Sequence, residues 1–275
     1  MRVRAGEIDW PSRYRDMVAA SDAAAPPRPP DRWQGRAARF DRMSRKALGD
    51  AEIEAGLAPI VRPSDVVIDV GAGTGRHAIP LATRCARLVA IEPSPAMRAL
   101  LSARVAEERA SNVEVIGREW PDDEAPLGDV VFSAHVVYGV AEIVPFVSAM
   151  TERARRTCAL LLKLSAPADA LADVAQALHG VRRPRRPGAL EALAVLHQLG
   201  HAAELAILRG SSRPMSFSDD EDDLREVAMR TGVSPDAEGL GRVRLALDQA
   251  ATRTSDGWLV GEVGPTARVT WPGRG

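Results

Sequence analysis

The feature that most constrains the fold is a glycine-rich turn between a short apolar run and a helical segment. It reads Val66-Val67-Ile68-Asp69-Val70-Gly71-Ala72-Gly73-Thr74-Gly75. Glycines are needed where a backbone turns tightly and approaches a ligand with no Cβ in the way. Open α/β sheets bind ligands at the carboxyl ends of their strands, which is where this turn falls. The segment therefore predicts a strand with a ligand site immediately after it.

Apolar runs and helical patterns alternate along the chain from about residue 64 to residue 164. The predicted strands cover 65–70, 87–92, 112–117, 129–134 and 158–164. The predicted helices cover 75–85, 94–108 and 141–154. Apolar strands that alternate with helices are typical of parallel strands covered on both faces. The sequence therefore predicts an α/β fold with a doubly wound, mostly parallel sheet.

Residues 1–60 are expected to form a helical N-terminal cap, and residues 61–275 the ligand-binding domain. The first twenty residues carry apolar side chains at near-helical spacing, and 32–60 resume such a pattern. Between them lies the proline-rich segment 23–31, which reads as a linker because proline lacks a backbone donor.

After the fifth strand the chain departs from simple alternation. Residues 166–200 are expected to form a helical insertion or lid, in which two helices flank the arginine-rich loop 181–187, and 201–209 reads as a strand. Ser218 is predicted to begin a helix, through a capping box with Glu221.

That helix is expected to end at Gly232. The apolar runs within 256–271 predict a C-terminal β-hairpin across a Gly-Pro turn, with Trp258 and Trp271 in its core.

The composition is that of an ordinary soluble globular protein. Of the 275 residues, 45% are hydrophobic and 27% charged, and the net charge of -1 gives no reason to expect a nucleic-acid or membrane partner. Cys85 and Cys158 cannot build a disulfide framework. Because the chain shows neither a signal-peptide pattern nor a run of about 20 apolar residues, a cytoplasmic location is expected. The near absence of lysine favours a bacterial origin.

The glycine spacing separates two classes of cofactor. Dinucleotide-binding turns have the pattern G-x-G-x-x-G, whereas this chain has G-x-G-x-G followed by Arg76 and His77. Glu92 ends the next strand, where a carboxylate can accept both hydroxyls of a ribose. Charge-assisted hydrogen bonds of this kind contribute roughly 1.5–3 kcal/mol each.

The pattern D-V-G-A-G-T-G, followed by an acidic residue at the end of the next strand, resembles the class I S-adenosylmethionine-dependent methyltransferases. The resemblance covers about residues 60–165. It also draws on Pro93 and Met97, on the polar segment after the third strand, and on D-V-V-F-S-A-H in the fourth. It implies a Rossmann-like methyltransferase sheet, S-adenosylmethionine as cofactor with S-adenosylhomocysteine as product, and methyl transfer by in-line displacement.

The resemblance also implies which residues hold the methionine end of the cofactor. Gly71, Ala72 and Gly73 would run under the methionine moiety, and Ser133 would lie beside the sulfonium. Asp69 has two interpretations, an acceptor that stabilises the turn or a contact to the methionyl amine.

At the other end, the resemblance assigns Glu92 to the ribose, with Pro93 and Met97 packed on the adenine. Glu119 is the candidate for a hydrogen bond to the adenine amino group. Trp120 could stack on the base instead.

His135 and Tyr138 follow the fourth strand, where this family commonly places groups that face the substrate. His135 is the candidate general base, with an unperturbed pKa of about 6.5, and Tyr138 could orient the acceptor. The structural alternative is that both only shape the loop. Trp33, Arg36 and Phe40 are candidates for a lid over a small or medium-sized acceptor.

Three rival functions remain open: an RNA or protein methyltransferase, a non-catalytic regulatory protein that binds S-adenosylmethionine, and, least favoured by the glycine spacing, a nicotinamide oxidoreductase. The arginine-rich loop could grip an anion, because guanidinium groups suit phosphates and carboxylates, or it could be a solvated loop. His197 and His201 lack a third ligand, so no metal site is predicted. The acidic run 219–223 needs no ligand, because it lies at a helix N-terminus.

Overall fold

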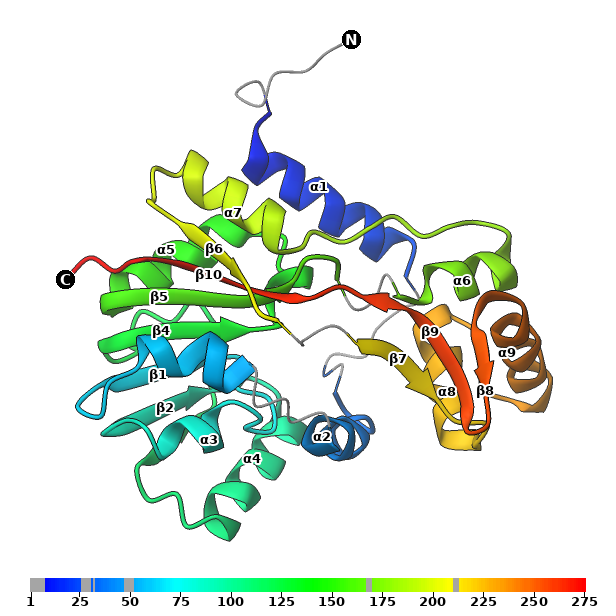
Figure 1. Ribbon diagram of the computed structural model, residues 1–275, viewed down its shortest axis with the longest axis horizontal. Coiled ribbons are helices and arrows are strands. Elements are labelled where there is room, and N and C mark those ends of the chain that lie inside the picture. Colours follow the sequence, from blue (N-terminus) through cyan, green and yellow to red (C-terminus); the bar gives the residue numbers. More distant parts are fainter. Residues whose placement is uncertain (1–7, 26–30, 32, 47–51, 167–169, 210–212) are drawn as a thin grey trace.

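In the computed structural model, a large seven-stranded sheet and a small three-stranded sheet lie side by side (Figure 1). The structure describes residues 8–25, 31, 33–46, 52–166, 170–209 and 213–275. The large sheet has the strand order β3-β2-β1-β4-β5-β10-β6. Its strands are β1 (Val66–Val70), β2 (Arg87–Ile91), β3 (Val113–Ile116), β4 (Gly128–Ala134), β5 (Ala154–Lys163), β6 (Glu204–Ile207) and β10 (Thr266–Pro272).

The pairing of these strands confirms the doubly wound, mostly parallel sheet. β3, β2, β1, β4 and β5 pair in parallel, and β10 runs antiparallel to both β5 and β6. The order reverses at β1, which lies between β2 and β4. Ligands of open α/β sheets bind at such a reversal, beyond the carboxyl ends of the strands.

Helices cover both faces of the large sheet (Figure 1). One face carries α1 (Trp10–Ala23), α5 (Ile143–Arg153) and α7 (Ala189–Gln198), and the other carries α3 (Ala78–Ala82) and α4 (Pro95–Glu107). Alternate residues of β1 point to opposite faces, so Ile68 joins the core under the first layer and Val67 the core under the second. Tyr14 of α1 is fully buried in the first core, so α1 is an integral part of that layer.

The segment predicted as helical over 32–60 divides into different elements. It contains α2 (Ala37–Lys46), the π-helical turn η2 (Glu52–Leu57) and the 3₁₀ turn η3 (Ala58–Ile60). Ile53 and Leu57 of η2 pack in the second core. This packing brings the buried Glu52 beside the sheet.

The small sheet has the order β7-β9-β8, formed by β7 (Arg213–Phe217), β8 (Thr252–Thr254) and β9 (Gly257–Val263). Around it lie α6 (Ala172–His179), α8 (Glu221–Thr231) and α9 (Ala237–Ala250) (Figure 1). A C-terminal antiparallel hairpin is present, but its strands are β8 and β9, and the two runs expected to pair across the Gly-Pro turn, β9 and β10, lie in different sheets. The Gly-Pro step carries the chain from β9 into β10 of the large sheet. Trp258 and Trp271 are therefore both buried, in different cores.

One local expectation needs correction. The cap of α8 is Asp220, whose side chain accepts from the Asp223 N–H at 2.8 Å, and Ser218 instead donates its hydroxyl to Asp220. Gly232 ends the helix as expected, in the left-handed conformation with φ of 78°. The expected helices of 166–200 belong to different surroundings, because α7 packs on β5 and β10 whereas α6 packs on α8 and α9.

None of the helices within the described residues combines the length and the apolar character that a membrane crossing requires.

Candidate functional site

The glycine turn follows β1 at the reversal of strand order. Gly71, Gly73 and Gly75 have φ of 77°, 58° and 83°, in the left-handed region that favours glycine. A Cβ on Gly71 would lie 2.5 Å from Val136, and one on Gly75 would lie 2.6 Å from Leu101. A Cβ on Gly73 would meet no described atom within 4 Å. The turn is therefore packed at its two ends and open in the middle.

Glu92 comes directly after β2 and holds the open part of the turn. Its Oε2 accepts the Gly73 N–H at 2.8 Å, and its Oε1 accepts the Ser94 N–H at 2.8 Å. The Ser94 hydroxyl donates to Asp31 at 2.9 Å, which ties the start of the α2 region to this edge of the sheet. Two of the roughly four acceptor positions of this carboxylate are thus occupied by backbone N–H groups beside the open part of the turn.

Asp69 is buried in β1, with an exposed fraction of 1%. Its Oδ2 accepts no hydrogen bond from any described residue. Burial raises the pKa of Asp69 well above its usual range, and the neighbouring charge of Glu92 raises it further. A buried carboxylate oxygen without a donor is costly. A cationic ligand group could supply the missing donor.

The residues expected at the adenine lie around the N-terminus of α4 and after β3. Met97 is buried, whereas Pro93 and Glu119 are exposed. Trp120 is half-buried, and its indole N–H donates to the Phe146 carbonyl at 3.0 Å. The rings of Trp120 and Phe146 meet edge to face, with centroids 6.3 Å apart. Trp120 is thus anchored to the core by its polar end.

Two further expected residues are held by the sheet itself. The Ala72 N–H donates to the Ile91 carbonyl at 3.1 Å, which joins the turn to the end of β2. Ser133 is buried in β4, and its hydroxyl donates to the Val70 carbonyl at 2.8 Å. This bond fixes the end of β4 against the end of β1, below the turn.

His135 and Tyr138 lie in contact just beyond β4, Tyr138 in the 3₁₀ turn η4 (Val137–Gly139). The Tyr138 oxygen is 3.0 Å from His135 Nδ1 and accepts the Lys163 N–H at 2.6 Å. Which group donates in the contact between His135 and Tyr138 depends on the tautomer of His135. His135 Nε2 is 3.1 Å from Glu52 Oε1. Both ring nitrogens of His135 therefore have partners in this structure.

Glu52, which no sequence pattern singled out, lies at the centre of this network. Its Oε2 is 3.1 Å from His77 Nε2 and 3.0 Å from Arg76 Nη2, and its Oε1 accepts the Thr266 hydroxyl at 2.7 Å. Burial opposes ionisation, but the hydrogen bonds of His135 and His77 outweigh it and hold the pKa of Glu52 well below its usual range. Burial lowers the pKa of His77 to about 4, against the opposing hydrogen bond to Glu52.

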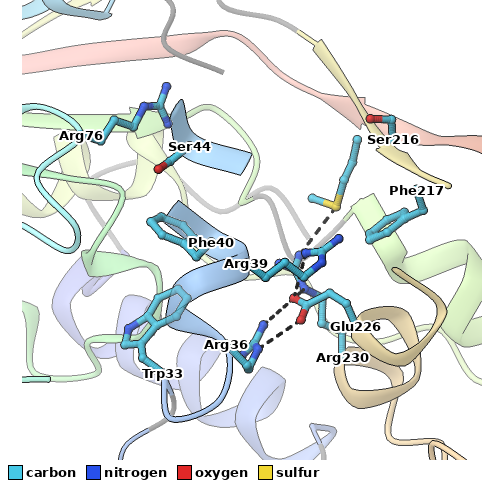
Figure 2. Close-up of a pocket in the computed structure, with 11 residues that line it drawn as sticks. Trp33, Arg36, Arg39, Phe40, Ser44, Arg76, Ser216, Phe217, Glu226 and Arg230 are labelled. Atoms are coloured by element: carbon cyan, nitrogen blue, oxygen red, sulfur yellow. Dashed lines mark hydrogen bonds and ion pairs between the residues drawn. The ribbon is translucent and has the colours of Figure 1, made fainter. Parts of the chain in front are cut away.

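A cavity of about 250 Å³ opens between α2, β7 and α8, beside the glycine turn (Figure 2). Aromatic and apolar side chains from two parts of the chain face it: Trp33, Phe40, Met215 and Phe217. Arginines also line it: Arg36, Arg39, Arg76 and Arg230. Arg76 directly follows Gly75, so the cavity adjoins the turn.

Three of these arginines, Arg36, Arg39 and Arg230, gather around one buried carboxylate, Glu226 (Figure 2). Arg36 contacts it with two nitrogens, at 2.7 and 3.3 Å, and Arg230 contacts it at 2.6 Å. Arg39 pairs with Asp223 and lies 3.9 Å from Glu226. Burial raises the pKa of Glu226, but the arginines overcome this and lower it to about 2. These three arginines and two carboxylates leave an excess of one positive charge.

The arginine-rich loop 181–187 uses its side chains within the protein. Arg183 donates to the carbonyls of Arg230 and Thr231, and Arg186 donates to the Tyr138 carbonyl and to Asp22. Arg182 pairs with Asp173, and Arg185 with Glu191. The loop thus joins α8 to α1 and to the η4 turn.

His197 and His201 do not lie beside a third metal-ligating side chain in the part of the chain that the structure describes. His197 is exposed, and His201 lies against Trp271, with ring centroids 6.3 Å apart. Among the described residues, the histidines that do converge are His77 and His135, around Glu52.

A family model described as a methyltransferase domain matches residues 67–163, the segment that runs from β1 to β5. Residues 67–163 form a class I, S-adenosylmethionine-dependent methyltransferase domain. The methyltransferase domain thus contains the glycine turn, Glu92 and the His135 loop. It leaves out α1, α2 and the whole small sheet.

Solved structures show the same fold at low sequence identity. The chain is similar to the YcgJ protein from Bacillus subtilis, with a TM-score of 0.57 and 14% identity, over 84% of this chain and 99% of that one. A putative methyltransferase from Bacillus halodurans gives a TM-score of 0.57 at 14% identity, over 81% and 98% of the two chains.

One curated relative matches a short part of the sequence. It is a probable ribosomal RNA small subunit methyltransferase A from Methanosphaera stadtmanae, 26% identical over 86 residues. The match covers 31% of this chain and 31% of the relative, so the two share less than a third of their length.

Proposed function

We propose that this chain transfers the methyl group of S-adenosylmethionine to a small or medium-sized acceptor bound in the arginine-lined cavity. The observation that carries the proposal is the open face of Gly73, whose N–H donates to the Glu92 carboxylate at 2.8 Å. The unpartnered Oδ2 of Asp69, at the end of β1, adds to it. These features fit the cofactor of the methyltransferase family. Glu92 would receive the ribose hydroxyls, and Asp69 the methionyl ammonium.

When bound, the cofactor supplies a methyl group on a sulfonium for in-line displacement. The protein's task is to align an acceptor with that methyl, and alignment alone can contribute about 7–11 kcal/mol. Arg76 borders both the turn and the cavity, so an acceptor in the cavity would lie next to the cofactor. The expected adenine contacts of Pro93, Met97, Glu119 and Trp120 remain part of this proposal.

His135 and Tyr138 are the proposed catalytic pair. Glu52 holds the imidazole through Nε2, which leaves Nδ1 as the nitrogen that can take a proton from an acceptor. For this, the Tyr138 hydroxyl, whose oxygen lies 3.0 Å from Nδ1, must give up its contact with that nitrogen. Tyr138 would then be available to orient the acceptor.

The cavity supports an acceptor with an apolar or aromatic body and a negative charge. Trp33, Phe40 and Phe217 provide the apolar surface, and the arginines provide the excess positive charge. In the loop 181–187, Arg183 and Arg186 are engaged in internal contacts, and the exposed Arg182 and Arg185 are paired with carboxylates, so the loop offers an RNA backbone less free positive charge than its four arginines suggest. The small-molecule proposal is therefore preferred to the RNA alternative.

Calorimetric titration with S-adenosylhomocysteine, with NADH as the comparison, tests the cofactor. We expect binding of the former alone and a loss of more than about tenfold in affinity for Glu92→Gln. Glu114→Gln, an exposed β3 residue paired with Arg87, is the matched control and should bind normally. Absence of S-adenosylhomocysteine binding by the wild-type protein would refute the proposal.

The acceptor class is tested by thermal shift with hydroxybenzoates and their neutral amides, in the presence of S-adenosylhomocysteine. We expect the carboxylates to stabilise the protein more than the amides. Arg39→Gln should remove that difference. Equal shifts for acids and amides would contradict a cavity selective for anions.

A further inference from the structure

Three side chains with metal-ligating atoms converge from distant segments at the edge of the large sheet. Glu52 comes from η2, His77 directly precedes α3, and His135 follows β4. One ligand atom from each lies within 4.8 Å of the other two. Glu52 and His77 are buried, and the His135 side chain is 20% exposed.

We propose that Glu52, His77 and His135 bind a divalent first-row transition metal ion. Two imidazole nitrogens and one carboxylate form a ligand set that suits zinc, iron(II) and their neighbours. Three protein ligands leave coordination positions open for water or for an oxygen of a small molecule. Mg²⁺ prefers oxygen ligands and is not expected to bind.

The distances are close to those that a metal needs. Ligands about 2.1 Å from an ion are separated from one another by roughly 3–3.5 Å. Both Glu52–histidine distances are already 3.1 Å. The cluster therefore needs to contract by no more than about 1–2 Å at its widest separation.

The hydrogen bonds around the cluster are also compatible with metal binding. Metal on Nε2 of each histidine requires only that the ring proton lie on Nδ1. For His135, that proton would face the Tyr138 oxygen 3.0 Å away. Hydrogen bonds of this kind orient metal-bound histidines in proteins.

The neighbouring groups provide both support and competition. The Thr266 hydroxyl holds Glu52 Oε1 at 2.7 Å. The Arg76 guanidinium lies 3.0 Å from Oε2, with 23% of its side chain exposed. Since a metal ion and Arg76 compete for the same carboxylate, metal binding must displace the guanidinium. Removal of the Arg76 charge should therefore strengthen metal binding.

The site lies between the glycine turn and the acceptor cavity. His77 follows Gly75 by two positions, and Arg76 lines the cavity. A metal ion here could hold an acceptor oxygen and lower its pKa, in place of a base at His135. That role rests on the proposed function, whereas metal binding itself does not.

Metal-free, tag-free protein is titrated with Co²⁺ alone, with calorimetry and visible absorption as readouts. We expect one Co²⁺ per chain, displaced by Zn²⁺ and not by Mg²⁺. Glu52→Gln and His77→Gln should each weaken Co²⁺ binding by more than about tenfold. The controls Glu54→Gln and His197→Gln, which change an exposed glutamate and an exposed histidine, should bind as the wild type does.

Two further measurements do not depend on the stability of those variants. Arg76→Gln should bind Co²⁺ more tightly than the wild type, and an anomalous difference map of wild-type crystals grown with Co²⁺ should show a peak between the three side chains. No Co²⁺ binding at millimolar concentration, a peak elsewhere, or unchanged affinity in both Glu52→Gln and His77→Gln would overturn the proposal. Because no cofactor is present, these results are independent of S-adenosylhomocysteine binding.

Discussion

Replacement of Gly73 by alanine separates the binding role of the glycine turn from its folding role. Gly73 has φ of 58° and open space where a Cβ would lie. Gly71, two positions earlier, has φ of 77°, but its Cβ would lie 2.5 Å from Val136. The same substitution at the two positions therefore adds one methyl group to a ligand space in one case and to a packed interior in the other.

The expected costs follow from these surroundings. A left-handed conformation costs an L-residue about 1–2 kcal/mol, so Gly73→Ala should destabilise the protein by about that amount. Gly71→Ala adds the cost of overpacking, about 1–3 kcal/mol. The overpacking cost of Gly71→Ala should disappear in the double variant Gly71→Ala/Val136→Ala, because truncation of Val136 removes the colliding methyl groups.

Urea denaturation gives the free energy of unfolding, and calorimetry gives the affinity for S-adenosylhomocysteine. We expect Gly73→Ala to remain folded and to lose more than about tenfold in affinity, which corresponds to 1.4 kcal/mol. An affinity within about threefold of the wild type would show that the cofactor does not pass over Gly73. Equal destabilisation by Gly71→Ala and Gly73→Ala would refute the inference that Gly71 is packed against Val136 while Gly73 faces open space.

Three other perturbations test separate parts of the site. Asp69→Asn should lower the affinity for S-adenosylhomocysteine by more than about tenfold. In the wild-type protein, stability should fall as pH rises through the raised pKa of Asp69, and thermal unfolding of Asp69→Asn should not show this fall. The lowered pKa of Glu226 adds up to about 3 kcal/mol to the free energy of unfolding above pH 4.5, and this contribution is lost as pH falls from 4.5 through about 2. Arg36→Gln should reduce this pH-dependent contribution, as measured by urea denaturation. His135→Ala should slow methyl transfer while S-adenosylhomocysteine affinity stays unchanged, and unaltered turnover would remove His135 from the proposed mechanism.

The core of the methyltransferase domain could be predicted because its signals are local. The strand expected at 65–70 is β1, Val66–Val70, and the turn after it is encoded in five consecutive positions of glycine and its neighbours. Glu92 could be placed because the end of β2 lies beside the end of β1 in any parallel pair. These features depend on spacing along short stretches of sequence.

Glu52 could not be placed from the sequence because its partners are far apart along the chain. His77 is 25 positions away and His135 is 83. A single acidic residue in a segment with a helical pattern carries no sign of such partners. Only the packing of Ile53 and Leu57 against the sheet brings Glu52 there.

The small sheet was largely missed for a related reason. Its strand β7 pairs with β9, more than 40 positions later, so neither strand indicates its partner locally. The helix α9 contains Gly239 and Gly241, which weaken a helical signal. Gly239 is required there, since a Cβ would lie 1.9 Å from the Ser234 carbonyl.

The chain leaves the large sheet after β6 and returns to it at β10, and these two strands are neighbours. The Leu208 N–H, just past β6, donates to the carbonyl of Thr266, the first residue of β10, at 2.8 Å. The chain therefore leaves and re-enters the large sheet at the same place, and β6 and β10 connect the β7–β9 unit to that sheet. A unit attached in this way can be exchanged or reshaped without a change of register in the parent sheet. Since Met215 and Phe217 of that unit form one wall of the cavity, evolution can vary that wall while the glycine turn and Glu92 stay constant.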